Sequence, residues 1–183
     1  SSGKFKNLFT GTIGDIGCLS FNGNKIITSG GGGMIITNNN FVAKKARYFI
    51  NQAKDNSQKY IHNEIGYNYK LSNIQSAIGY AQIKKIGKLI TKKKKIHETY
   101  CSNIDKINGI KILKRPFFSS SNYWLNILLI DNQIIKFNRD KFILFLSRNK
   151  IQARSVWHPN HLQKPFEKNQ YYNIENANYL VQN

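Results

Sequence analysis

Four consecutive glycines, Gly30–Gly33, stand between two short apolar segments of the chain. The first flanking segment, Asp15–Phe21, predicts a short buried strand, and the second, Met34–Thr37, predicts another strand. Because glycine adopts backbone conformations that other residues avoid, the run lets the chain turn tightly and approach a ligand closely. Lys25 lies in the loop between the first strand and the glycines. The sequence therefore predicts two strands joined by a compact loop that carries a lysine.

Lys25 is the first candidate for chemistry. A lysine in low-dielectric surroundings loses its proton more easily and becomes a nucleophile, which bond formation with a carbonyl requires. Ser20, at the end of the first predicted strand, offers a hydroxyl that can donate to a phosphate. The competing interpretation is an ordinary surface lysine beside a glycine-rich loop, and this segment alone leaves both open.

The remaining pattern predicts further helices and strands. Helices are expected at 41–53, 73–104 and 139–149, and strands at 110–113, 123–130 and 151–157. Gly79 and Gly87 indicate close packing in the long helix, since glycine costs up to about 1 kcal/mol relative to alanine there. The closing order of strand, strand, helix and strand indicates a small α+β unit. We expect the boundary before this unit to lie within or near the end of the long helix.

The chain has a formal net charge of +19, from 28 Lys and Arg against 9 Asp and Glu in 183 residues. Such an excess is typical of proteins that bind nucleic acid, here through Lys92–Lys95. However, 23 of the basic residues are Lys and 5 are Arg, whereas nucleic-acid sites favour Arg. We therefore interpret the charge as mainly compositional, with the lysine run and His97 on the solvated face of a helix. No nucleic-acid partner is expected.

Other common site types find little support. Cys18 and Cys101 follow no metal or redox spacing and predict reduced thiols in a cytoplasmic protein. His158 and His161 have a spacing found in helical metal sites, but Pro159 lies between them, so no metal is expected. No apolar run approaches the roughly 18 residues of a membrane span, so no membrane insertion is expected.

Four segments, in this order, resemble motifs of the DegT/StrS-type nucleotide-sugar aminotransferases. The lysine segment, 14–33, is similar to the family pattern Gly-Asp, strand, Ser-Phe, three residues, Lys, then Thr-x-Gly-x-Gly-Gly. Residues 63–75 resemble the signature Gly-Tyr-Asn-Tyr-Arg-Leu-Thr-Asn-Ile, and 121–126 and 153–161 resemble motifs of the small domain. The likeness extends over nearly the whole chain, and four ordered motifs are far more specific than a lone glycine pattern.

The resemblance implies a fold and a cofactor. The fold would be the α/β, aspartate-aminotransferase-like fold type I, with 1–90 finishing the large cofactor-binding domain and 91–183 forming most of the small α+β domain. The cofactor would be pyridoxal 5'-phosphate. Lys25 would form the Schiff base with it and later carry a proton between cofactor and substrate, and Ser20 would bind its phosphate.

The resemblance also implies roles for three further residues. Asn68 would reach the phosphate of the cofactor bound mainly by the other subunit, because family members are homodimers with shared active sites. Lys70 and His161 would lie near the nucleotide sugar. Lys70 stands where the family usually has Arg, and a lysine does not replace an arginine that binds bidentately.

The likeness is strongest to the branch that makes 4-amino-4,6-dideoxy sugars from UDP-linked 4-keto-6-deoxy N-acetylhexosamines for surface glycans. L-glutamate would be the amino donor. A dehydrating offshoot of the family has His at the lysine position, and Lys25 argues against it. Because the family's cofactor aspartate lies upstream of this segment, the 183 residues alone are expected to be inactive. The alternatives are a basic nucleic-acid- or anion-binding module and an inactive aminotransferase remnant.

Overall fold

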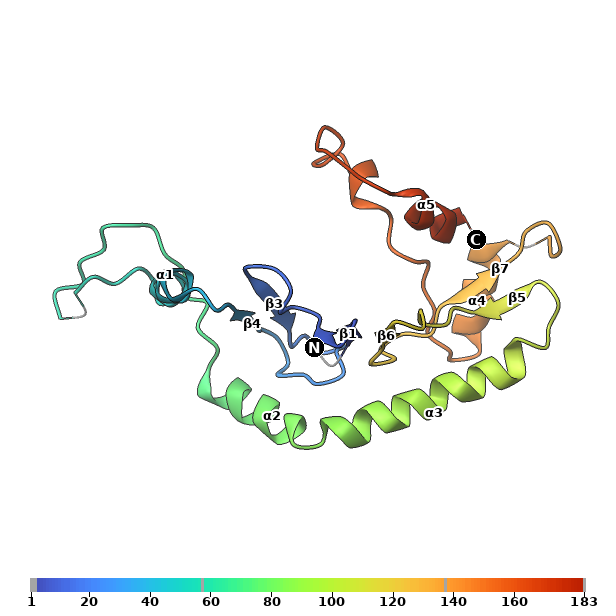
Figure 1. The fold of residues 1–183 in the computed structure, drawn as a ribbon, viewed down its shortest axis with the longest axis horizontal. Helices are drawn as coiled ribbons and strands as arrows, with labels where there is room; N and C mark the ends of the chain where they lie inside the picture. The colour runs from blue at the N-terminus through green and yellow to red at the C-terminus, as the bar shows by residue number, and fades with distance from the viewer. Residues whose placement is uncertain (1–2, 57, 137, 183) are drawn as a thin grey trace. The chain divides into compact units, whose positions relative to one another are not determined.

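The computed structural model describes residues 3–56, 58–136 and 138–182, and Figure 1 shows their course. The chain divides into two compact units. The first unit comprises Ser1–Ile96 and Arg115–Trp124, and the second comprises His97–Lys114 and Leu125–Asn183. Residues 115–124 thus return to the first unit after the chain has entered the second.

Two small antiparallel sheets lie in the first unit. One has the strand order β2-β1-β6, from β1 (Lys4–Phe5), β2 (Leu8–Phe9) and β6 (Ser119–Ser120). The other pairs β3 (Gly17–Ser20) with β4 (Gly33–Ile36). The register places Gly17 opposite Ile36 and Ser20 opposite Gly33. Both strands predicted around the lysine loop are confirmed, the first shortened and the second shifted by one residue. The burial expected for the first strand is wrong, because Cys18 and Ser20 are exposed.

Side-chain caps begin the first two helices. The side chain of Asn39 accepts hydrogen bonds from two backbone N–H groups at the start of α1 (Asn40–Ile50). Ser72 and Gln75 form a capping box at the start of α2 (Asn73–Ile83). Such caps satisfy N–H groups that have no partner within the helix. The helix starts expected near residues 41 and 73 are confirmed.

The long helix expected at 73–104 is two helices, so that prediction is wrong at its middle. After α2 the chain makes a turn, in which the Lys85 N–H donates to the Gln82 carbonyl at 2.9 Å, before α3 (Ile86–Ile104) begins. The side chain of Gln82 accepts a 2.9 Å hydrogen bond from the Thr28 N–H. The last turn of α2 is thereby tied to the lysine loop.

The second unit is built around the antiparallel pair β5 (Ile110–Ile112) and β7 (Leu128–Ile130). It also holds α4 (Arg139–Arg148), the short 3-10 helix η1 (Asn160–Leu162) and α5 (Glu175–Gln182). Asp105, just after α3, accepts hydrogen bonds from the Ile112 N–H at 2.9 Å and from Lys114 at 2.7 Å. These bonds fix the end of α3 against β5.

Two strand predictions in this unit need correction. The strand expected at 123–130 is confined to Leu128–Ile130. The strand expected at 151–157 is wrong, because these residues form no regular secondary structure. An apolar pattern shows only that a segment could pair, whereas a strand also needs a neighbour with free backbone groups. Ile151 and Trp157 are 50% and 67% exposed.

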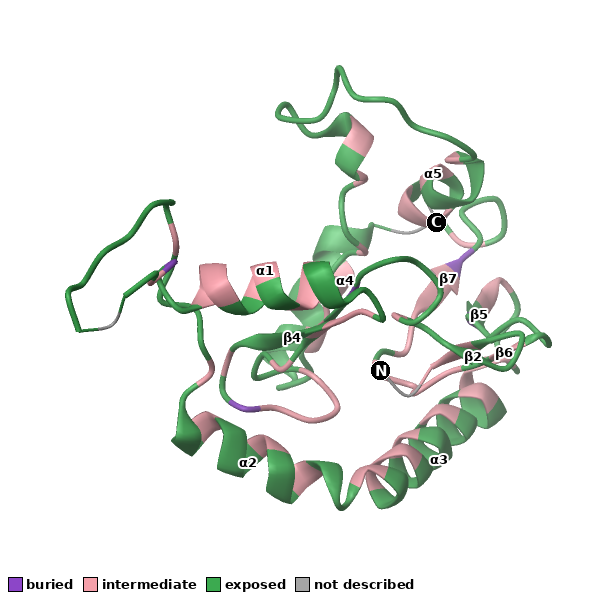
Figure 2. Cartoon of the chain, turned by 60° about the vertical axis from the view of Figure 1, so that its left-hand side comes forward, coloured by how far each residue is buried: buried purple, intermediate pink, exposed green. Residues whose placement is uncertain are grey.

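Little of the described chain is buried, as Figure 2 shows. The buried apolar side chains are Ala53, Ile112 and Ile130. The accessible surface is 14838 Å², whereas two separate compact domains of half this mass would together expose about 11,000 Å². Many large apolar side chains therefore lie on the surface.

Candidate active site around Lys25

The loop that carries Lys25 is closed by its own hydrogen bonds. The Phe21 N–H donates to the Gly32 carbonyl at 3.0 Å, and the Ser29 N–H donates to the Phe21 carbonyl at 2.9 Å. The Thr28 hydroxyl also donates to the Phe21 carbonyl, at 3.0 Å. The Lys25 N–H donates to the Asn22 carbonyl at 3.0 Å. The lysine therefore projects from a loop whose two ends are joined.

The glycine run is required by this closure. Gly30 and Gly32 have φ angles of +79° and +78°, which L side chains rarely adopt. A Cβ on Gly32 would lie 2.5 Å from Leu71 Cδ1, and one on Gly33 would lie 2.5 Å from the Leu19 carbonyl oxygen. A Cβ on Gly31 would meet only Gln75 Nε2, at 3.9 Å. Of Gly31, Gly32 and Gly33, only Gly31 could therefore be replaced by a residue with a side chain without a close contact.

Trp124 covers the lysine. Lys25 Nζ lies 3.7 Å from the centroid of the Trp124 ring, within the range of a cation–π interaction. The indole N–H of Trp124 donates a 2.7 Å hydrogen bond to the carbonyl of Asn24, next to the lysine. Both side chains are half-buried. Trp124 lies in the segment 121–126, but the sequence predicts no role for it, because no local pattern links it to a residue 99 positions earlier.

Ser20 lies at the end of β3, as expected, and its side chain is exposed. Its Oγ accepts a 3.4 Å hydrogen bond from the Asn22 N–H, so the hydroxyl proton can turn toward a ligand. Ser20 and Lys25 thus stand on the strand and on the loop that follows it. Whether they share one cofactor stays a prediction.

Asn68 and Lys70 lie on a separate segment, the strap, which we define as residues 51–72 between α1 and α2. The strap is pinned to the end of α1 by the Tyr67 N–H, which donates to the Phe49 carbonyl at 2.8 Å, and by the Tyr69 N–H, which donates to the Ile50 carbonyl at 3.0 Å. Asn68 and Lys70 are exposed. Among the described residues, neither is hydrogen-bonded to Lys25 or Ser20.

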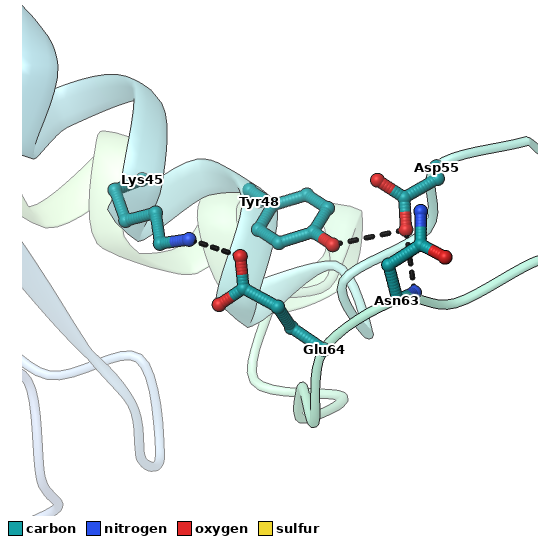
Figure 3. Close-up of polar contacts among 5 residues, drawn as sticks. All are labelled: Lys45, Tyr48, Asp55, Asn63 and Glu64. Carbon is teal, nitrogen blue, oxygen red and sulfur yellow. Dashed lines mark hydrogen bonds and ion pairs between the residues drawn. The ribbon is translucent and has the colours of Figure 1, made fainter.

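A cluster of polar side chains braces the strap, and Figure 3 shows it. Asp55 Oδ2 accepts hydrogen bonds from the Asn63 N–H at 2.7 Å and from the Tyr48 hydroxyl at 3.0 Å. Lys45, on α1, forms an ion pair with Glu64. The hydrogen bond from the Asn63 backbone, above all, holds the pKa of Asp55 below its usual value. Partial burial and the bond to Asp55 raise the pKa of Tyr48.

His161 belongs to the second unit, in η1. Its ring lies 5.3 Å from that of Tyr171, centroid to centroid, at a tilt of 41°. Tyr171 lines an open hollow with Gln170 and Tyr172. The predicted contact of His161 with the nucleotide sugar stays a prediction.

One side-chain expectation is wrong and one is confirmed. His97 is half-buried rather than fully exposed, and its Nδ1 lies 2.9 Å from Asn126 Oδ1 and its Nε2 3.6 Å from Cys101 Sγ. Cys18 and Cys101 are free thiols, as expected. In the described part of the chain, no three His, Cys, Asp or Glu gather to hold a metal ion. None of the helices described is both long and apolar enough to cross a membrane.

Comparison with known proteins gives relatives over almost the whole chain. The EpsN protein of Bacillus subtilis (strain 168), whose name places it among the pyridoxal phosphate-dependent aminotransferases, is 34% identical over 173 residues. That match covers 94% of this chain and 44% of EpsN. GDP-perosamine synthase of Vibrio cholerae is 34% identical, over 86% of this chain and 42% of the enzyme. The chain therefore spans less than half the length of the curated relatives it matches.

Solved structures agree on the fold. The aminotransferase TlmJ from Streptoalloteichus hindustanus superposes with a TM-score of 0.84 at 19% identity, covering 98% of this chain and 48% of TlmJ. The Helicobacter pylori aminotransferase PseC gives a TM-score of 0.82 at 23% identity, with 98% and 49% covered. The chain thus has the fold of about half of these proteins, which is fold type I. Since the model of the DegT/DnrJ/EryC1/StrS aminotransferase family matches residues 3–183, the chain belongs to that family.

Proposed function

We propose that this chain is the lysine-bearing part of a pyridoxal phosphate-dependent sugar aminotransferase and that Lys25 is the residue bonded to the cofactor. The observation that carries the proposal is the position of Lys25, on a glycine-closed loop with Nζ 3.7 Å from an aromatic ring. The donor set fits the cofactor. A primary amine suits its carbonyl carbon, and the hydroxyl of Ser20 and the amide of Asn68 suit its phosphate.

Lys25, Ser20 and Asn68 would have different roles in the reaction. When bound, the cofactor supplies a conjugated ring that withdraws electrons from the substrate carbon. Lys25 Nζ would hold the cofactor and, when displaced by an amine, would carry the proton between cofactor and substrate carbon. The exposed Ser20 hydroxyl would orient the phosphate, with Asn68 serving the active site of a partner subunit.

The names of the relatives support a class of substrate for this proposal. Among the relatives are GDP-perosamine synthase and dTDP-4-amino-4,6-dideoxy-D-glucose transaminase, the latter 33% identical over 51% of this chain. A nucleotide-linked 4-keto-6-deoxy sugar is the acceptor that these names suggest. We further propose that the sugar is UDP-linked, that L-glutamate is the amino donor, and that Lys70 and His161 lie near the sugar nucleotide. We also propose that the full protein is a cytoplasmic homodimer in which residues 1–90 belong to the large domain.

The decisive experiment uses the full protein with pyridoxal phosphate. After borohydride reduction, mass spectrometry should find the cofactor attached to the peptide that contains Lys25. Lys25→Ala should lose both the attachment and the visible absorbance. The matched control is Lys84→Ala, which removes another lysine that lies over a ring, 4.3 Å from the Tyr80 centroid. Attachment that persists in Lys25→Ala would refute the proposal.

A basic anion-binding module is the second candidate, and the distribution of charge favours it. The first unit holds 17 Lys and Arg against 3 Asp and Glu. This candidate predicts binding to nucleic acid that weakens steeply with salt and falls when Lys92–Lys95 are neutralised. The aminotransferase predicts that neutralising Lys92–Lys95 leaves cofactor attachment at Lys25 intact. Binding and attachment measured on the same variant separate the two.

A further inference from the structure

We propose that Trp124 is a positioning residue that holds the side chain of Lys25 whenever this lysine is not bonded to the cofactor. The inference rests on the proposed function of Lys25. It adds a second position for the lysine, on the ring face, to the bonded position that the function requires.

The indole of Trp124 makes two contacts with adjacent residues of the loop. The ring face lies 3.7 Å from Lys25 Nζ, and the ring edge donates its N–H to the Asn24 carbonyl at 2.7 Å. The edge contact orients the indole relative to the loop backbone, so the face is presented to the next side chain. A lysine over a Tyr or Trp face is attracted by the negative potential of that face.

A lysine that takes part in amino transfer needs a defined position for its side chain while it is not bonded to the cofactor. During amino transfer Lys25 must leave the cofactor, remain close and return, and a long unbranched side chain has many other conformations. The indole face attracts the ammonium group and limits this freedom. The Trp124 contact would therefore favour the state with the lysine released over the state with the lysine bonded.

The first test uses the full protein stripped of cofactor. An amine-acylating reagent is applied in limiting amount, and mass spectrometry measures the labelling of individual lysines. In Trp124→Leu the labelling rate of Lys25 should rise about two- to fivefold, which an interaction of about 0.5–1 kcal/mol would give. Tyr80→Leu is the control, because it should expose Lys84 and leave Lys25 unchanged. An unchanged Lys25 rate in Trp124→Leu would overturn the inference.

A second measurement leaves the ring in place, in case Trp124→Leu does not fold. These 183 residues hold two tryptophans, so Trp157→Phe, combined with Phe in place of any tryptophan in the remainder of the full protein, makes Trp124 the sole indole emitter. In that background, Lys25→Met should change the emission of the cofactor-free protein, whereas Lys25→Arg, which retains a cation, should resemble the parent. Identical emission from the Met variant and the parent would also overturn the inference.

The two proposals fail in different ways. If the cofactor attaches to a lysine other than Lys25, the proposed function is wrong even if the labelling changes as expected. If Lys25 carries the cofactor but labelling and emission do not respond, the inference about Trp124 alone is wrong. In the loaded enzyme, Trp124→Leu should also shift the ratio of amine to aldehyde cofactor, at fixed glutamate and 2-oxoglutarate, about two- to fivefold toward the aldehyde.

Discussion

Asp55 Oδ2 accepts hydrogen bonds from the Asn63 N–H and the Tyr48 hydroxyl, which tie the start of the strap to its middle and to α1. These bonds stabilise the ionised carboxylate, and they hold the pKa of Asp55 below its usual value. A lowered pKa means that this stabilisation is present above the unfolded-state pKa of about 4 and is lost as pH falls through the folded-state pKa. The strap that carries Asn68 should therefore loosen in acid.

Asp55→Asn should loosen the strap at neutral pH without acid. The neutral amide accepts a weaker hydrogen bond than the carboxylate. Amide exchange measured on the full protein should show lower protection at Asn63 in the variant at pH 7. The difference should shrink as the pH falls through the lowered pKa of Asp55, where the wild-type carboxyl also protonates. Asp15→Asn is the control, and equal protection of Asn63 in wild type and Asp55→Asn at pH 7 would contradict the prediction.

The two thiols should differ in accessibility. Cys18 is exposed on β3, whereas Cys101 is half-buried with its Sγ 3.6 Å from His97 Nε2. A neutral aromatic disulfide reagent should therefore modify Cys18 before Cys101 in the folded protein. Cys18→Ser and Cys101→Ser assign the two phases by mass. Faster modification of Cys101 would contradict the burial described.

At the scale of elements, two glycines in neighbouring helices behave differently. A Cβ on Gly79, in α2, would lie 2.7 Å from Ser29 Oγ, a buried hydroxyl that has no hydrogen-bond partner in the described structure. A Cβ on Gly87, in α3, would have nothing within 4 Å. The expectation of close packing is therefore confirmed at Gly79 and wrong at Gly87.

Alanine at these two positions should have different effects on stability. Gly87→Ala should raise the free energy of unfolding by about 0.5–1 kcal/mol, because alanine favours the helix and no atom obstructs its Cβ. Gly79→Ala should not show this gain, because the Ser29 hydroxyl must move. In a Ser29→Ala background, Gly79→Ala should recover the gain. Denaturant unfolding of the full protein measures all four variants, and equal gains at the two glycines would contradict the structure.

Local signals account for the elements that could be predicted from sequence. Three helices begin directly after a capping residue, which is Asn39, Ser72 or Asn138. The start of each helix can therefore be predicted from residues within one turn of it. The β3–β4 hairpin likewise follows from apolar residues on both sides of a glycine run. The break at Lys84–Lys85 could not be predicted in this way, because the bond that holds Gln82 there comes from Thr28. Trp124 over Lys25 is also a contact between distant residues.

At the scale of the whole molecule, apolar side chains remain on the surface. Ile65, Phe117 and Tyr172 are 82%, 93% and 86% exposed. Isolated exposed apolar residues are ordinary, but soluble monomers rarely expose this much apolar surface together. The chain spans less than half the length of its relatives, and under the proposed function the remainder of the aminotransferase would cover these residues.

The 183 residues expressed alone should therefore be poorly packed and inactive. We expect strong binding of a hydrophobic dye, a broad thermal transition and concentration-dependent association, all reduced in the full protein. No turnover of L-glutamate with a UDP-linked 4-keto sugar is expected from the isolated segment. A sharp cooperative transition together with turnover would contradict this prediction.

The contact between Trp124 and Asn24 spans 100 residues, which has a consequence for the order of folding. A ribosome adds about 5–20 residues per second, so roughly 5–20 s pass between synthesis of the lysine loop and synthesis of the ring that covers it. The pairing of β1 with β6 is delayed in the same way, because β6 is synthesised more than 100 residues after β1. During synthesis the nascent chain thus exposes Lys25 without the ring that later covers it, and the lysine loop is among the last parts of the first unit to be completed.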